Sequence, residues 1–115
     1  MIDTIPLGDI LFLDIETVPQ SHDFNTLPEE AQELWELKTK YQRKDEFTPE
    51  ELYERAGIWA EFGKIICISV GYFNFKGDIR TFRTTTFHGD EVKLLKEFKN
   101  LLITHFSNAK HLLCG

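Results

Sequence analysis

The sequence predicts an α/β protein whose mixed sheet is covered by helices. Apolar runs at Ile10–Ile15 and Lys64–Phe73 have the length and composition of buried strands. Asn74–Asp78 has turn chemistry, and the Thr- and Phe-rich segment Ile79–Thr86 is expected to return antiparallel to the strand before it. Apolar residues at helical spacing after Gly89 predict a long helix that packs on this sheet.

A charged helix is expected between the first strand and the second. Thr26 is a candidate N-cap, and Glu29 three residues later would complete a capping box. The helix would then run to about Arg43. Its inward face is expected to carry the apolar residues at helical spacing, namely Ala31, Leu34, Leu37 and Tyr41.

A second capping box predicts another helix directly afterwards. Thr48 is the expected cap, Pro49 stands at the first helical position, and Glu51 occupies the third. Leu52 and Ala56 would face inward, and Trp59 is a further candidate for that face.

The last part of the chain is expected to be a helix followed by a strand. Asp90 and Glu91 complement the dipole of a helix that starts near Gly89. Its single apolar stripe consists of Leu94, Leu95, Phe98, Leu101, Leu102 and Phe106. His111–Cys114 then has the pattern of a strand, which completes the order β, α, α, β, β, α, β. Because a domain seldom ends one residue past a buried strand, we expect residues 1–115 to be the N-terminal part of a single domain.

Composition restricts the function classes. The chain has 115 residues and a net charge of −6, which argues against a domain that grips nucleic acid through general positive potential. No stretch reaches the ~20 apolar residues of a membrane helix. The two cysteines, Cys67 and Cys114, lie in apolar runs without zinc-type spacing, so buried free thiols are expected. A reducing, cytoplasmic location is the prediction.

The strongest functional signal is a pair of acids at the end of the first strand. Asp14 and Glu16 are separated by a single residue, so alternation along the strand points both side chains to the same face. Two neighbouring carboxylates repel each other where solvation is poor. A divalent cation between them would relieve that repulsion, and Mg²⁺ prefers carboxylate oxygen. A solvated strand end is the alternative interpretation.

The order of elements and the segment Leu11–Pro19, together with Phe62–Phe73 and the helix from Glu91, resemble the DEDD 3′-5′ exonucleases. The closest similarity is to the exonuclease domain of family-B DNA polymerases and to predicted stand-alone bacterial exonucleases related to it. This resemblance implies a ribonuclease H-like fold, here truncated after the fourth strand. It also implies that the second and third exonuclease motifs are absent from residues 1–115.

In that family four acids bind two metal ions, Mg²⁺ or Mn²⁺, and the first two acids match Asp14 and Glu16. By resemblance, Asp14 bridges the ions, Glu16 holds the ion on the side of the attacking water, and Thr17 contacts the terminal nucleotide. The substrate would be a single-stranded DNA or RNA 3′ end. With two of the four acids, this chain is expected to be inactive alone.

Two other functions compete with this hypothesis. Haloacid-dehalogenase-like phosphatases also place acids after an apolar strand, but their second acid is Asp and their sheet is parallel. A non-catalytic interaction module is the third hypothesis, in which an exposed sheet edge favours self-association.

Two further groups of side chains are weaker candidates for contact with nucleic acid. One is the basic stretch, Lys38, Lys40, Arg43 and Lys44, for which a solvated helix face is favoured. The other is a set of aromatic residues, Trp35, Tyr41, Trp59 and Phe62, which either stack on bases or pack in the core.

Overall fold

A computed structural model describes residues 4–115 and confirms the α/β class and the predicted order of elements. The strands and helices are β1 (Ile10–Pro19), α1 (Glu29–Arg43), α2 (Pro49–Leu52), β2 (Gly63–Lys76), β3 (Ile79–His88), α3 (Glu91–His105) and β4 (Leu112–Cys114). Short 3₁₀ helices lie at Leu7–Asp9, Phe24–Thr26 and Tyr53–Ile58. Within the described part, no helix combines the length and apolar composition that a membrane span requires.

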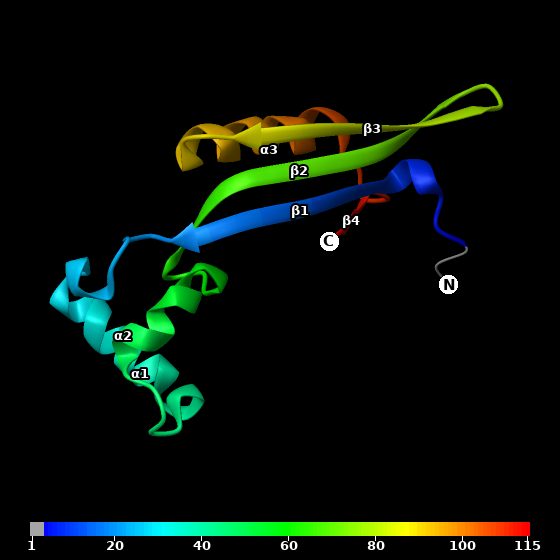
Figure 1. Cartoon of the computed structure of the whole chain (residues 1–115). Coiled ribbons are helices and arrows are strands. Elements are labelled where there is room, and N and C mark those ends of the chain that lie inside the picture. Colours follow the sequence, from blue (N-terminus) through cyan, green and yellow to red (C-terminus); the bar gives the residue numbers. More distant parts are fainter. Residues whose placement is uncertain (1–3) are drawn as a thin grey trace. The chain divides into compact units, whose positions relative to one another are not determined.

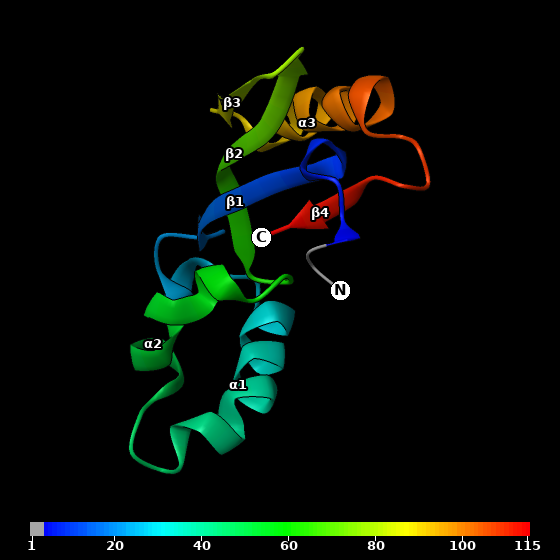
Figure 2. The ribbon, with the colours of Figure 1, turned by 90° about the vertical axis from the view of Figure 1, so that its right-hand side faces the viewer.

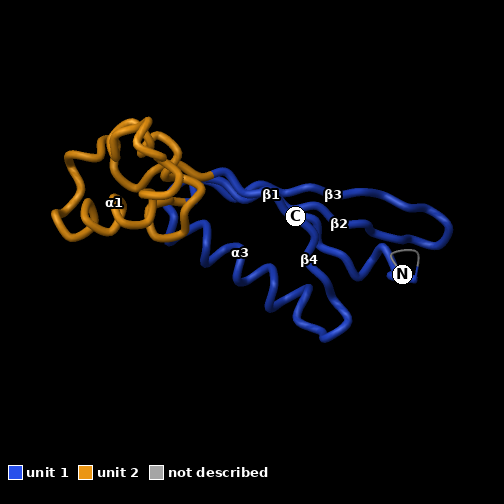
Figure 3. The backbone as a smooth tube through the Cα atoms, turned by 90° about the horizontal axis from the view of Figure 1, so that it is seen from below, with its two compact units in different colours: residues 1–16, 65–115 blue, residues 17–64 orange. Residues whose placement is uncertain are grey.

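The chain forms two compact units, which Figure 3 colours separately. The first contains the residues up to 16 together with 65–115, and the second contains 17–64. Each unit has its own cluster of buried side chains.

The first unit is built on a four-stranded mixed sheet with the order β3-β2-β1-β4 (Figure 1). β2 and β3 are antiparallel, from Cys67 opposite His88 to Lys76 opposite Ile79. Gly77 joins them with a φ of 63°, a left-handed conformation that glycine adopts without strain. β4 pairs in parallel with β1, so the first strand lies inside the sheet between the hairpin and β4.

Helix α3 covers one face of this sheet, as Figure 2 shows. It begins at the predicted place, because the Asp90 side chain accepts a hydrogen bond from the backbone N–H of Lys93 at 3.2 Å. Glu91 also accepts a bond from the backbone N–H of Ile65 at 2.6 Å, which ties the helix start to β2. The buried centre consists of Leu11, Ile68, Val70 and Leu94, with Phe98, Leu101, Leu102 and Phe106 packed against it.

One member of the predicted α3 stripe does not join this core. Leu95 keeps 40% of its surface exposed, whereas Leu94 is fully buried. A helix that lies on a sheet buries a narrower strip than a helix surrounded by other elements, and one residue is a rotation of about 100°. Leu94 occupies the centre of that strip, and Leu95 therefore turns toward its edge.

The second unit is organised around Trp35, which is fully buried on α1. Rings of Tyr53, Trp59 and Phe62 meet it edge-on, with centroids 5.0–5.8 Å away. Its indole N–H donates to the carbonyl of Pro49 at 2.8 Å, so the polar atom of the buried ring is satisfied. Leu52 and Ala56 belong to the same cluster, as their spacing predicted, and Trp59 packs against it.

The predicted inward face of α1 is confirmed at Ala31, which packs against this cluster, and is wrong at its other three residues. Leu34, Leu37 and Tyr41 are exposed by 41%, 70% and 88%, whereas Trp35 and Thr39 are buried. Burial of the largest side chain of the helix outweighs burial of several smaller ones, and it turns the Leu face to solvent. Thr39 is accommodated because its hydroxyl donates to the Trp35 carbonyl at 2.7 Å.

The first predicted capping box is also wrong, and the second is confirmed. Thr26 lies inside a 3₁₀ helix and donates to the carbonyl of Asp23 at 2.6 Å, while Pro28 precedes α1. At the second helix, Thr48 and Glu51 make the reciprocal pair of hydrogen bonds, at 3.2 and 3.0 Å. That helix is short and continues as a 3₁₀ turn.

Candidate metal centre at Asp14 and Glu16

Strand β1 places the two predicted carboxylates. Leu11 is buried and Leu13 packs against the same cluster under α3, so the odd residues of β1 point to the covered face of the sheet. Alternation therefore directs Asp14 and Glu16 to the opposite face of the sheet, the open face, which α3 does not cover. Both residues are exposed. The predicted arrangement of two acids on one face agrees with this strand geometry.

No described basic side chain neutralises this pair. Within residues 4–115 the ion pairs join Lys38 to Glu61 and Lys110 to Asp9, the latter at 3.5 Å. The side chains of Asp14 and Glu16 make no hydrogen bond or ion pair to another described residue. Because both are exposed, water screens their repulsion more than the sequence suggested, and their oxygens are available to a cation.

Two carboxylates alone are an incomplete metal site. Among residues 4–115, no group of three or more His, Cys, Asp or Glu side chains has an arrangement that would hold a metal ion. Mg²⁺ requires six oxygen ligands in near-octahedral geometry, and two carboxylates supply at most four. The oxygen donors fit a hard divalent cation, but water or further acids would have to complete its coordination.

The parallel strand β4 leads to the same region of the sheet. Phe12 lies opposite Cys114 in the register, and a Cβ built on Gly115 would be 3.1 Å from the carbonyl oxygen of Leu13. Because parallel strands end at the same edge, the end of β4 lies beside the part of β1 that precedes Asp14. A residue that followed Gly115 would therefore start close to the carboxylates.

A hollow of about 540 Å³ lies on the open face of the sheet, with Asp14 in its lining. Neighbouring residues of the hollow include Phe12, Ser69, Phe82, Thr84 and Thr86. The residues from β2 and β3 were not predicted as partners of Asp14. Alternation of Ser69 and Gly71 with buried residues was a signal for one face, but only the register of the hairpin places Phe82 and Thr84 beside them.

No family model, curated protein or solved structure matches the chain. The exonuclease resemblance therefore rests on the residues of the chain itself.

The remaining candidates have different surroundings. Thr17 continues β1 and is half-buried in the second unit. Lys38 pairs with Glu61, and Arg43 donates to the hydroxyl of Thr39 and to the carbonyl of Glu36, which favours the solvated-helix interpretation of the basic stretch. Both cysteines are free thiols, but Cys114 is exposed and Cys67 half-buried, so full burial of the thiols was wrong.

The four aromatic residues that were candidates for base stacking fall into two groups. Trp35 and Phe62 are buried, and Trp59 is partly buried against them, so core packing explains these three rings. Tyr41 is 88% exposed and lies outside the aromatic contacts of the described residues.

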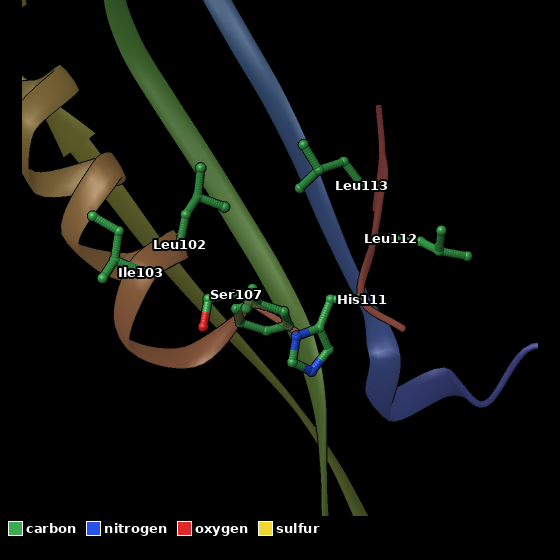
Figure 4. A pocket seen from close by; sticks show the side chains of 7 residues that line it. Leu102, Ile103, Ser107, His111, Leu112 and Leu113 are labelled. Carbon is green, nitrogen blue, oxygen red and sulfur yellow. The ribbon is translucent and has the colours of Figure 1, made fainter. Parts of the chain in front are cut away.

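A second hollow in the first unit, of about 380 Å³, lies where α3 ends and β4 begins (Figure 4). Leu102 and Ile103 of α3 and Leu113 of β4 give it apolar walls, and His111 lies at its lower end in this view. Its lining contains no carboxylate. The hollow therefore offers apolar contact rather than metal chemistry.

Proposed function

We propose that the chain carries the first metal-binding motif of a metal-dependent 3′-5′ exonuclease. The observation that supports this is the pair Asp14 and Glu16, two exposed carboxylates on one face of an interior strand without a basic partner among residues 4–115. A structural role for two such acids would call for an ion pair or a cap, and neither is present there. A pair of free carboxylates is suited to bind a divalent cation.

The proposed roles follow from the order of the residues. Asp14 would hold both ions, Glu16 would hold the ion nearer to the attacking water, and Thr17 would contact the terminal nucleotide. When bound, two such ions lower the pKa of the attacking water and stabilise the charge on the leaving 3′ oxygen. The two carboxylates would hold the ions on the exposed face in the middle of β1, where a polynucleotide end can approach from solvent.

The sheet supports the ribonuclease H-like part of the proposal. The first strand is interior, with an antiparallel hairpin on one side and a parallel strand on the other. Along the chain, a helix connects the hairpin to that parallel strand. This is the arrangement that the resemblance implies for the part of the fold before the second motif. The same arrangement disfavours a phosphatase of the haloacid-dehalogenase type, which needs a parallel sheet beside the catalytic strand.

The remaining acids are proposed to lie outside residues 1–115. If the gene continues past Gly115, the next residues start beside Leu13, where a third acid could reach the ions. A cytoplasmic enzyme that acts on single-stranded DNA or RNA 3′ ends is the proposed context. The interaction-module alternative predicts no metal dependence at all.

A digestion assay tests the proposal. The protein that includes the residues encoded after Gly115 is incubated with 5′-labelled single-stranded DNA or RNA and Mg²⁺ or Mn²⁺. We expect stepwise shortening from the 3′ end, and a loss of several orders of magnitude in Asp14→Ala, because one ligand positions both ions. Asp78→Ala, which removes an exposed acid at the hairpin turn, is the matched control. Equal digestion by the two variants would contradict the assignment.

A further inference from the structure

The open face of the hairpin carries an aromatic group formed by Phe12, Phe73, Phe75 and Phe82. The rings of Phe73 and Phe82 have centroids 4.9 Å apart, and each lies 6.1 Å from the ring of Phe12. Phe75 contacts Phe73 at 6.5 Å. Phe75 and Phe82 remain 51% and 50% exposed. Half-exposed rings held in place by their neighbours provide an apolar surface for a ligand.

Phe82 connects this group to the hollow that contains Asp14. Its ring lies against Gly71 of β2, so that it forms part of the lining. Beyond the ring, hydroxyl groups of Ser69, Thr84 and Thr86 line the same hollow, and those of Ser69 and Thr86 are 3.2 Å apart. The lining therefore combines an aromatic ring, on which a base could stack, with hydroxyl groups to which a sugar could hydrogen-bond. The Asp14 carboxylate lies in the same lining, where a phosphate would approach it only through a bound cation.

A cation lies on the opposite side of the aromatic group. The guanidinium of Arg80 is 5.5 Å from the centre of the Phe73 ring, and Arg80 stands opposite Phe75 in the register. Arginine binds phosphate and also stacks on aromatic rings. A phosphate group that approaches the far end of the aromatic group would therefore meet a positive charge.

We propose that this face binds the end of a single-stranded nucleic acid, with a base stacked on Phe82 and a backbone phosphate near Arg80. The proposal rests on the proposed function for its choice of ligand, and it adds residues of β2 and β3 that the acid motif does not contain. Stacking tolerates any base, so binding is expected to show little sequence preference. With one arginine at the site, the logarithm of affinity should fall with the logarithm of salt concentration with a slope near −0.7, as for about one phosphate contact.

The test is the binding of 5′-fluorescein-labelled (dT)₁₀, measured by fluorescence anisotropy in EDTA so that no digestion occurs. Phe82→Ala should weaken binding by roughly 5- to 100-fold, the range for one base stacked on an aromatic side chain. Phe47→Ala is the matched control, because Phe47 is similarly exposed, at 48%, but belongs to the second unit, outside the aromatic group and the hollow. Arg80→Gln should flatten the salt dependence. Phe82→Leu retains apolar contact with Gly71. It replaces Phe82→Ala in the comparison if circular dichroism shows that Phe82→Ala is unfolded.

Equal affinities of the Phe82 and Phe47 variants would overturn the proposal, and so would the absence of oligonucleotide binding. If light scattering instead shows a dimer that Phe82→Ala converts to monomer without any oligonucleotide binding, the face belongs to self-association. Failure here is distinct from failure of the proposed function. Loss of metal binding in Asp14→Asn with unaltered oligonucleotide binding in Phe82→Ala would reject only this site. If metal binding is unaltered in Asp14→Asn and oligonucleotide binding is weakened in Phe82→Ala, only the metal centre is rejected.

Discussion

The ring of Phe82 occupies the space where a side chain on Gly71 of the neighbouring strand would begin. Its Cε1 atom is 2.9 Å from the position that a Cβ on Gly71 would occupy. Phe82 pairs directly with Phe73 and diagonally with Gly71, so the glycine leaves room for the ring to lie on the sheet. This contact holds the ring between the aromatic group and the hollow beside Asp14.

A methyl group at position 71 should displace that ring. We expect Gly71→Ala to lower the free energy of unfolding by about 1–3 kcal/mol, the usual effect of overpacking. Thermal denaturation followed by circular dichroism measures this. Gly8→Ala is the control, because its added Cβ would lie 3.5 Å from the Phe75 ring, an ordinary contact. An unchanged midpoint for Gly71→Ala would show that Phe82 moves aside freely.

The capping box at Thr48 should stabilise the start of α2. Thr48→Ala removes the acceptor of the Glu51 N–H and is expected to cost about 0.5–2 kcal/mol. Thr48→Ser retains a hydroxyl and should stay close to the wild type. Urea denaturation of the three proteins measures the difference. A serine variant as unstable as the alanine variant would mean that the methyl group, rather than the cap, stabilises the turn.

Trp35 should dominate the stability of the second unit. Trp35→Ala removes a fully buried ring and its hydrogen bond to Pro49, with an expected cost of about 3–5 kcal/mol. Tyr41→Ala removes an aromatic residue of the same helix that is 88% exposed, and should change stability by less than about 0.5 kcal/mol. Denaturant midpoints compare the two. Similar losses would contradict the orientation of α1.

The acids of β1 should contribute nothing to folding. Asp14→Asn removes a charge that has no ion pair within residues 4–115 and lies near another negative charge, so the midpoint in EDTA should stay the same or rise slightly. Asp90→Ala provides the contrast, because it removes the cap of α3 and should cost about 1 kcal/mol. Thermal denaturation in EDTA measures both. A clear loss of stability in Asp14→Asn would indicate a structural role for this carboxylate.

The sequence predicted the elements whose signals are local. The strand that contains Asp14, the turn at Gly77 and the caps at Thr48 and Asp90 each depend on a few adjacent residues, and each appears in the structure, although β1 continues to Pro19 and the acids lie within it rather than at its predicted end. The inward face of α1 could not be read in this way. Its apolar pattern favoured Leu34 and Leu37, whereas long-range packing of Trp35 with residues from 49 to 62 decided the rotation of the helix.

The candidate site likewise contains residues that local sequence predicted and residues that it did not. Asp14 and Glu16 are two residues apart, so strand alternation was sufficient to predict a common face. Phe82 and Thr84 lie far from them in sequence, and the hairpin register brings them to the hollow. The register of the hairpin depends on the length of its turn, and the pattern of residues in each strand does not determine that length.

Manganese binding tests the central claim most directly. The 115-residue chain is titrated with Mn²⁺ and the free ion is followed by electron paramagnetic resonance, in parallel with Asp14→Asn, Glu16→Gln and the control Asp78→Asn. We predict weak, saturable binding by the wild type and by Asp78→Asn, and its loss in each of the other two variants. Indistinguishable titrations for all four proteins would contradict a metal centre at Asp14 and Glu16.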